Sequence, residues 1–214
     1  MRGSQTTLPR MDHPPAPDFR VRAFNYIPAR RQAVVFDTET TGVTGADRVV
    51  SLAAVPLDAG LRPSGPALHL VFNPGRSSHP AARAVHGLQD KFLARQPPFA
   101  DHAEEVAALF RGRVLVAHNL SFDLRMLAQE YGALGLPAPG GRGGRYCTML
   151  EFRVRHAGQS AKLDLVLRHL GLPARTGATH GAFEDAMLAM HVLHRLHHVA
   201  EPHPVLPAAF QNAR

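Results

Sequence analysis

Residues 33–40, AVVFDTET, constrain the fold most, because they join an apolar strand to two carboxylates. Alternate residues of a strand point to opposite faces, so Asp37 and Glu39 should lie on the same face. Like charges on one face repel, and burying either one without a partner costs free energy. One interpretation ends the strand at Asp37 and leaves a solvated Thr/Gly turn. The other places both acids in a functional cluster.

The size and composition indicate one globular domain. The chain has 214 residues, of which 45% are hydrophobic and 19% are charged, as in ordinary folded domains. Its single cysteine, Cys147, excludes an intrachain disulfide and a multi-thiolate zinc site, and it fits a reducing cytoplasm. No apolar run is long enough to cross a membrane, and the first ten residues lack the apolar segment of a secretory signal. We therefore expect a cytoplasmic protein with no membrane partner.

The formal net charge is +7, and all the lysine and arginine residues except Lys91 and Lys162 are arginine. Excess positive charge favours a polyanionic partner, and arginine binds phosphate in a bidentate manner. Genome composition alone can also produce arginine in place of lysine. The charge therefore favours a nucleic-acid partner without identifying one.

The order of the predicted elements indicates a single α/β domain. Residues 1–31 contain scattered proline and arginine and are predicted to form a flexible basic arm, 32–200 to form the domain, and 201–214 to form a short tail. Three strands are followed by helices, one strand and further helices, which predicts a mixed sheet flanked by helices. The predicted strands are 33–40, 48–58, 67–75 and 113–118, and the predicted helices are 80–88, 89–96, 101–112, 121–131, 162–171 and 182–198. Asp101 is the expected cap of its helix, and residues 145–155 are ambiguous between strand and helix.

Two further acids and a histidine stand at the starts of predicted helices. Asp123 falls in the first turn after the strand that ends at His118, while His180 precedes the last helix and Asp185 lies in its first turns. Each acid alone is explained by the helix dipole. Strand ends and adjacent helix starts, however, meet at one crevice of an open α/β sheet.

The joint pattern is one of four converging carboxylates. Buried together, they require compensating charge, and an all-oxygen ligand set selects hard ions such as Mg²⁺ or Mn²⁺. Two such ions about 3.5–4 Å apart can hold both the attacking and the leaving oxygen of a phosphodiester.

Three motifs carry a family resemblance. FDTETTG at 36–42, HN-x-x-FD at 118–123 and H-x-x-x-x-D at 180–185 resemble the three exonuclease motifs of the DEDDh 3′–5′ exonucleases, the group of the bacterial DNA polymerase III proofreading subunit epsilon. Residues 84–99, AVHGLQDKFLARQPPF, resemble the family's His-Gly-Ile stretch. The resemblance covers about residues 33–198 and implies a ribonuclease-H-like fold with two Mg²⁺ or Mn²⁺ ions.

The resemblance also implies a role for each acid. Asp37 would bridge both metals, Glu39 and Asp185 would complete the site of the metal that activates water, and Asp123 would hold the other metal through water. His180 would be the general base, which suits a side chain whose usual pKa lies near neutrality.

The implied substrate contacts are less complete. His86 would touch the terminal nucleotide, the backbone from Thr38 to Thr40 would line the same pocket, and Asn119 would orient the nucleic-acid strand. Ala81 stands where relatives can carry an acid that contacts the 3′ end, and this leaves recognition of the terminal nucleotide open. Glu184 adds a carboxylate beside Asp185, but adjacent helix positions point about 100° apart, so we expect it to be solvated rather than a ligand.

We therefore expect a metal-dependent 3′–5′ exonuclease that releases nucleoside monophosphates from single-stranded or mismatched DNA ends in proofreading or repair. Two alternatives stay open: an RNA-trimming enzyme of the same fold, and a catalytically silent module that binds nucleic acid or a polymerase. The expected partners are DNA or RNA and, as a protein partner, a DNA polymerase subunit.

Four histidines at helical spacing near the end of the last helix suggest a zinc face. A packed or solvated helix surface is the better prediction, because metal-binding histidines need further partners that orient their rings. These residues are His191, His194, His197 and His198.

Overall fold

The computed structural model describes residues 25–140 and 143–199. Most of the predicted N-terminal arm and the whole predicted C-terminal tail lie outside the described residues, so the division of the chain stays a prediction. Asn25 and Tyr26, which we assigned to the arm, lie beside residues 145–151. The Asn25 side chain donates to a Glu151 carboxylate oxygen over 3.1 Å, and the Tyr26 N–H donates to the Arg145 carbonyl over 3.3 Å.

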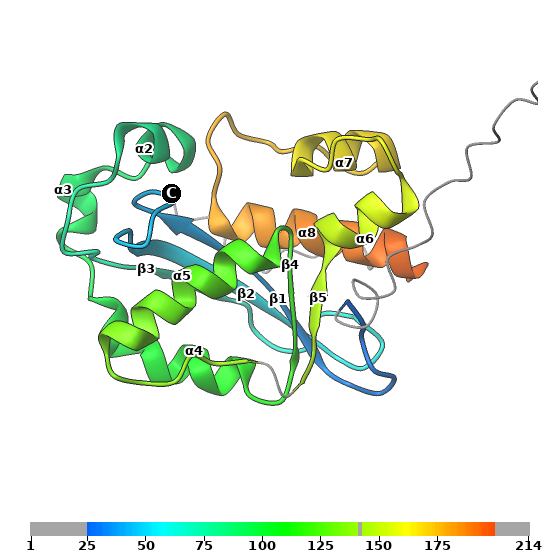
Figure 1. The fold of residues 1–214 in the computed structure, drawn as a ribbon, viewed down its shortest axis with the longest axis horizontal. Helices are drawn as coiled ribbons and strands as arrows, with labels where there is room; N and C mark the ends of the chain where they lie inside the picture. The colour runs from blue at the N-terminus through cyan, green and yellow to red at the C-terminus, as the bar shows by residue number, and fades with distance from the viewer. Residues whose placement is uncertain (1–24, 141–142, 200–214) are drawn as a thin grey trace, which may run out of the picture.

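A five-stranded mixed sheet forms the centre of the domain, as predicted (Figure 1). The strands are β1 (Ala33–Thr40), β2 (Val49–Leu57), β3 (Leu68–Val71), β4 (Val114–Ala117) and β5 (Arg145–Cys147), in the spatial order β3-β2-β1-β4-β5. β1 pairs antiparallel with β2, and β2 pairs antiparallel with β3. β4 lies parallel to both β1 and β5.

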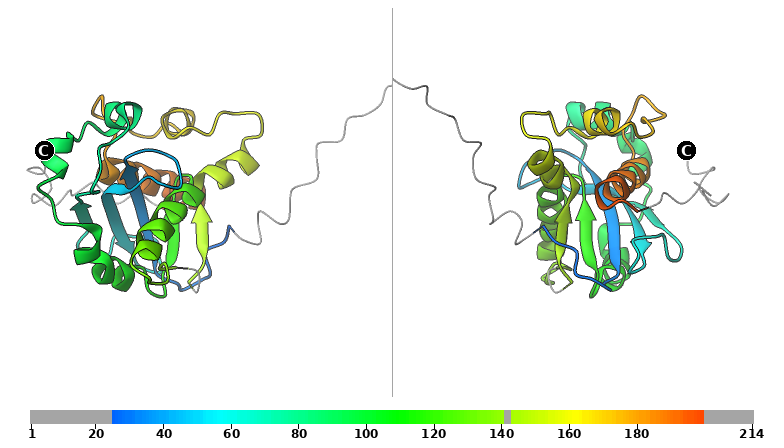
Figure 2. Two further views of the ribbon diagram at one scale, coloured as in Figure 1. Left: turned by 60° about the vertical axis from the view of Figure 1, so that its left-hand side comes forward. Right: turned by 90° about the vertical axis from the view of Figure 1, so that its right-hand side faces the viewer.

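Helices cover both faces of this sheet. They are α2 (Pro80–His86), α3 (Asp90–Leu93), α4 (Ala103–Phe110), α5 (Leu120–Ala133), α6 (Thr148–Arg155), α7 (Leu163–Leu170) and α8 (Ala182–His197), with a 3-10 turn η1 (Phe99–His102). α5 lies on one side of the strands and α8 on the other (Figure 2). α2 begins at the carboxyl end of β1, where the His79 N–H donates to the Thr41 carbonyl over 2.7 Å. Within the described part of the chain, no helix is long and apolar enough to span a bilayer.

Two local expectations needed correction or refinement. The ambiguous segment 145–155 contains both elements, because β5 ends at Cys147 and α6 begins at the next residue. The prediction that Asp101 caps a helix is wrong. Asp101 lies inside η1, and the residue before α4 is His102, whose side chain makes no capping hydrogen bond. The buried Phe99 ring packs between Phe72 and Tyr131, which fixes the turn at this point.

The two faces of β1 contribute to different cores. Val34 and Phe36 belong to the core under α4 and α5. Ala33 and Val35 belong to the core under α8. By the same alternation, Asp37 and Glu39 lie on the α8 face.

An ion pair between the buried Glu130 and the partly exposed Arg48 fixes α5 against β2. The Glu130 carboxylate, 1% exposed, accepts hydrogen bonds from Arg48 Nε and Nη2 over 2.8 and 2.6 Å, and from the Val49 N–H over 2.8 Å. This bidentate geometry is the strongest that arginine makes with a carboxylate. Because α5 also carries Asp123, the pair helps to position that acid at the carboxyl end of the sheet.

We predict that Glu130→Gln lowers the free energy of unfolding by about 2 kcal/mol, since its amide donor would face the Arg48 donors in a buried place. The matched control is Glu104→Gln, because Glu104 is 83% exposed in its pair with Arg111 and exposed pairs contribute only about 0–1 kcal/mol. Urea unfolding measures both. Equal unfolding midpoints for the two variants would contradict the proposed role of the buried pair.

Candidate functional site

Three carboxylates converge at the carboxyl end of β1. Asp37, Glu39 and Asp185 each offer an oxygen, and these oxygens lie within 4.8 Å of one another; no other such group occurs in residues 25–140 and 143–199. The interpretation that the strand ends at Asp37 is wrong. β1 continues to Thr40 and stays paired with β2, with an irregular register between Glu39 and Thr40.

Small side chains make this convergence possible. On β2, Ala53 lies opposite Asp37 and Ser51 lies opposite Glu39. Ala53 also packs against Ala182 and Ala186 in the first turns of α8. Because these side chains are short, the start of α8 approaches the sheet closely and brings Asp185 to the two strand acids.

Asp123 reaches the cluster from the other face. It is buried in the first turn of α5. Its Oδ1 accepts hydrogen bonds from the Thr38 N–H over 3.0 Å and from Thr38 Oγ1 over 2.7 Å. Asp123 is not one of the three closest carboxylates, yet its charge raises the pKa of Asp37.

Burial and mutual repulsion change the acidity of the cluster. Burial is the main cause that raises the pKa of Asp37 well above its usual range, followed by the charges of Asp123, Asp185 and Glu39. Burial and the Asp185 charge raise the pKa of Glu39 to about 8. Burial raises the pKa of Asp123 to about 7, although the Thr38 hydrogen bonds lower it. Protons or bound cations must therefore compensate this cluster at neutral pH.

The donor set fits hard divalent cations. All three converging groups are carboxylates, which are the ligands that Mg²⁺ and Mn²⁺ prefer. Two oxygens on one Mg²⁺ lie at most about 4.2 Å apart, given metal–oxygen bonds of about 2.0–2.1 Å, so oxygens within 4.8 Å of one another need only small side-chain shifts to share an ion.

His180 lies beside the cluster, immediately before α8. Its N–H donates to the Val85 carbonyl over 2.8 Å, which anchors it to the end of α2. Its Nδ1 lies 3.2 Å from Asp185 Oδ2, and the side chain is 40% exposed. The imidazole is thus both held in place and accessible to solvent.

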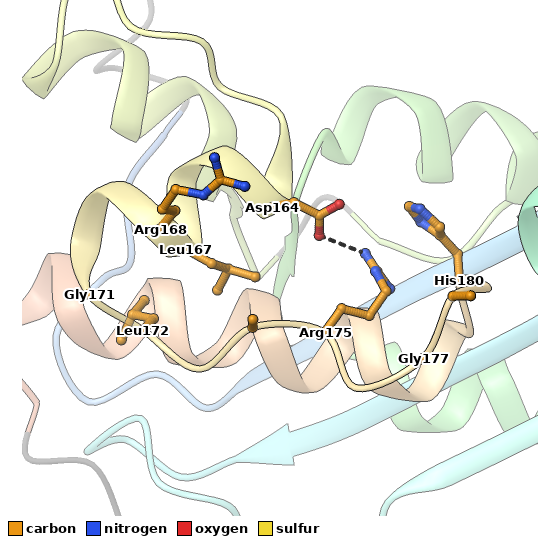
Figure 3. A pocket seen from close by; sticks show the side chains of 10 residues that line it. Asp164, Leu167, Arg168, Gly171, Leu172, Arg175, Gly177 and His180 are labelled. Carbon is orange, nitrogen blue, oxygen red and sulfur yellow. Dashed lines mark hydrogen bonds and ion pairs between the residues drawn. The ribbon is translucent and has the colours of Figure 1, made fainter.

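Arg175 is a site residue that the sequence reasoning missed. Its Nη1 forms an ion pair with Asp185 Oδ1. Its Nη2 lies 3.3 Å from Asp164 Oδ1 on α7 (Figure 3). The side chain is only 8% exposed. A lone arginine in a Gly/Pro-containing loop carries no sequence signal of burial. The four acids indicated a need for positive charge, which the sequence analysis assigned to divalent ions and not to an arginine.

The expected substrate-contacting residues lie on β1, at the end of α2 and just before α5. Thr40 Oγ1 donates to the Gly42 carbonyl over 2.6 Å, so this side chain shapes the turn after β1. His86 is buried at the end of α2; its Nδ1 accepts from the Leu88 N–H over 3.0 Å, and its Nε2 has no hydrogen-bond partner among the described residues. Asn119 is exposed before α5 in a left-handed conformation, with φ of 70°.

Two other predictions can be compared with the structure. Glu184 turns away from the ligand set, since its carboxylate accepts from Thr176 N–H and Oγ1, each over 2.7 Å. The histidines of α8 form no zinc site within the described ranges. His194 is buried with Nε2 2.6 Å from the Leu61 carbonyl oxygen, and His197 packs on the Tyr146 ring.

Comparisons with known proteins agree with this geometry. The family model RNase_T, described as Exonuclease, matches residues 34–193. The chain is 34% identical over 169 residues to the DNA polymerase III subunit epsilon-like protein of Rhodobacter capsulatus, covering 76% of this chain and 23% of that protein. It is 30% identical over 169 residues to the DNA polymerase III subunit epsilon of Escherichia coli, covering 74% of this chain and 68% of that protein.

Solved structures of exonuclease I share the fold. An apo form has a TM-score of 0.68 at 17% identity, covering 81% of this chain and 43% of that chain. The E. coli enzyme in complex with a 5cy-dT13 oligonucleotide has a TM-score of 0.64 at 16% identity, covering 76% of this chain and 40% of that chain. This chain thus spans less than half of those enzymes. The predicted ribonuclease-H-like domain with a mixed sheet is confirmed.

We predict a pH-dependent stability that comes from Glu39. Its folded-state pKa is raised from 4.5 to about 8, so its stabilising contribution is complete below pH 4.5 and is lost as pH rises through about 8. Glu39→Gln mimics the protonated form permanently. In EDTA, its melting temperature should match wild type near pH 4.5 and exceed it by at least about 3 °C near pH 8, equivalent to about 1 kcal/mol for a domain of this size.

Thermal melts at several pH values in EDTA make this measurement. Glu104→Gln is the control, because its side chain is exposed, and its difference from wild type should not change with pH. A Glu39→Gln curve parallel to wild type across the whole range would refute the assignment.

Proposed function

The chain belongs to the exonuclease family that the RNase_T model describes, and on that premise we propose that it removes nucleoside monophosphates from the 3′ end of DNA. The observation that carries this proposal is the convergence of Asp37, Glu39 and Asp185, whose oxygens lie within 4.8 Å of one another. Such a group suits two Mg²⁺ or Mn²⁺ ions. When bound, they would stabilise the charge of the reacting phosphate and activate the attacking water.

Each acid has a distinct place in this proposal. Asp37, whose pKa is raised by the charges of Asp123, Asp185 and Glu39, would contact both ions, while Glu39 and Asp185 would complete one ion site. Asp123 approaches from the α5 face, and its Oδ1 is already engaged by Thr38. We therefore assign Asp123 to the second ion through an intervening water.

His180 would take the proton from the attacking water. Its backbone is fixed to α2 and its imidazole is partly exposed beside the acids. Because Nδ1 faces Asp185, we assign proton acceptance to Nε2. A histidine suits this task, since its usual pKa lies close to neutral pH.

Single-stranded or mismatched DNA is the substrate that we propose, with proofreading or repair as the setting. The net charge of +7 favours a polyanion, and the relatives are named as DNA polymerase III epsilon subunits. The buried Nε2 of His86, which lacks a partner among the described residues, would meet the terminal nucleotide, next to the Thr38–Thr40 backbone and Asn119. A polymerase subunit is the protein partner that the relatives suggest.

We expect 5′-labelled single-stranded DNA to shorten from its 3′ end when Mg²⁺ or Mn²⁺ is present, and to stay intact in EDTA. Asp37→Asn, which keeps the shape of the side chain, is the control for contaminating nuclease and should leave the label at full length. Labelled RNA and a 3′-mismatched duplex in parallel lanes separate the alternatives. Faster loss of RNA would favour the RNA-trimming enzyme. Binding without cleavage would favour the silent module, and cleavage in EDTA would rule out the proposed mechanism.

His180→Ala should reduce turnover by about 10²–10⁴-fold, the usual contribution of a general base, while DNA and Mn²⁺ binding persist. The control is His102→Ala in η1, which removes an imidazole whose Nδ1 lies 3.0 Å from Glu105 Oε2. Turnover is measured with saturating DNA. A rate within about threefold of wild type, against the 10²-fold lower bound, would leave His180 with a structural role only.

A further inference from the structure

We propose that Arg175 is a resident cation of the metal site, which holds Asp185 in the metal-free protein and competes with divalent ions for it. This inference rests on the proposed function only in requiring that the carboxylates bind metal. It assigns a task to a residue outside the four acids and His180.

Both oxygens of Asp185 are engaged. Oδ1 pairs with Arg175 Nη1, and Oδ2 lies 3.2 Å from His180 Nδ1. An ion that binds Asp185 must therefore displace one of these groups or share an oxygen with it. Arg175 is the stronger competitor, because its guanidinium is always charged and is 8% exposed, whereas the His180 side chain is 40% exposed.

A second carboxylate, on Asp164, offers Arg175 an alternative ion pair. Asp164 Oδ1 lies 3.3 Å from Nη2, and Figure 3 shows the guanidinium between α7 and the start of α8. Both residues line a cavity of about 550 Å³ that also includes Arg168 and His180. The guanidinium can thus leave Asp185 and keep an ionic partner on α7.

The hydrogen bonding of Arg175 is incomplete. Its buried Nε has no hydrogen-bond partner among the described residues. An arginine that served only as a permanent clamp would be expected to satisfy this donor as well, because a buried unpaired donor costs free energy. The incomplete bonding is consistent with a side chain that has two alternative positions.

The charge of Arg175 also acts on the rest of the cluster. It lowers the pKa of Asp37 and of Glu39, against the larger effect of burial. A bound divalent ion would act in the same direction. Arg175 therefore replaces part of the metal charge and lets the acids remain together when no metal is bound.

The rival explanation is a structural clamp that ties the loop before His180 to α8 and stays in place when metal binds. Under that explanation, removing Arg175 destabilises the metal-free protein but does not strengthen metal binding. Under ours, the variant is destabilised without metal and binds metal more tightly. Metal affinity therefore distinguishes the two.

The test is a Mn²⁺ titration of the full chain. Binding is measured by calorimetry and by the loss of the electron paramagnetic resonance signal of free Mn²⁺. Arg175→Gln should bind Mn²⁺ at least about tenfold more tightly than wild type, which corresponds to about 1.4 kcal/mol. Its melting temperature in EDTA should be lower than that of wild type, and Mn²⁺ should raise it by more.

Arg168→Gln is the matched control, because it removes the same charge from the same cavity, whereas the ion pairs of Asp185 within the described residues are with Arg175 and His180. Its Mn²⁺ affinity should stay within about twofold of wild type, as expected for an exposed charge screened by solvent. An equal gain in both variants would mean that net charge alone sets the affinity, which would overturn the proposal.

Arg175→Lys covers the case in which the glutamine variant does not fold. A lysine keeps the charge but cannot bond two carboxylates through a planar fork, so tighter Mn²⁺ binding than wild type supports the proposal. Unchanged or weaker binding in the folded Arg175 variants overturns it. If wild type itself binds no Mn²⁺, the proposed function fails, whereas a metal-dependent nuclease with unchanged affinity in the variants removes only this inference.

Discussion

Repulsion among buried carboxylates at the end of β1 is the constraint on which the surrounding structure depends. Asp37 and Glu39 share a face because β1 continues to Thr40 as a paired strand. The short side chains of Ala53, Ala182 and Ala186 let α8 bring a third acid against them. Without compensating charge, repulsion among the three carboxylates would favour separation of β1 from α8. Because the short alanine side chains allow this close approach, the packing at the start of α8 also makes compensating positive charge necessary.

The fold meets this demand differently on its two faces. On the α5 face, Asp123 is stabilised by the N–H and hydroxyl of Thr38, and the ion pair of Arg48 with the buried Glu130 fixes the helix that carries it. On the α8 face, Asp185 is met by a full charge on Arg175 and by His180. Neutral donors orient one acid, and an ionic partner holds the other. In the proposed function, a metal ion would therefore replace an ionic partner on the α8 face, where Arg175 holds Asp185.

Sequence periodicity was sufficient to predict much of this arrangement. The alternation along 33–40 placed both acids on one face, and the positions of Asp123 and Asp185 after a strand and at a helix start predicted their approach to that edge. The exact end of β1 was ambiguous, since Thr and Gly suit both a strand end and a turn. Arg175 was not predictable, because its burial depends on a loop that packs against α7 and α8 rather than on any local pattern. The prediction that Asp101 caps a helix was wrong for a related reason. Burial of Phe99 fixes a 3-10 turn at this point, which overrides the capping preference of Asp101.

Asp185 links metal binding to the orientation of the proposed base. Its Oδ1 pairs with Arg175 and its Oδ2 lies beside the His180 ring. In the proposed function, the same carboxylate would also bind a divalent ion. An ion that replaced Arg175 on Oδ1 would leave Oδ2 facing the His180 ring, so the carboxylate would still orient the imidazole. In the proposed function, a single carboxylate would thus both bind the metal and orient the base, through contacts already present in the structure.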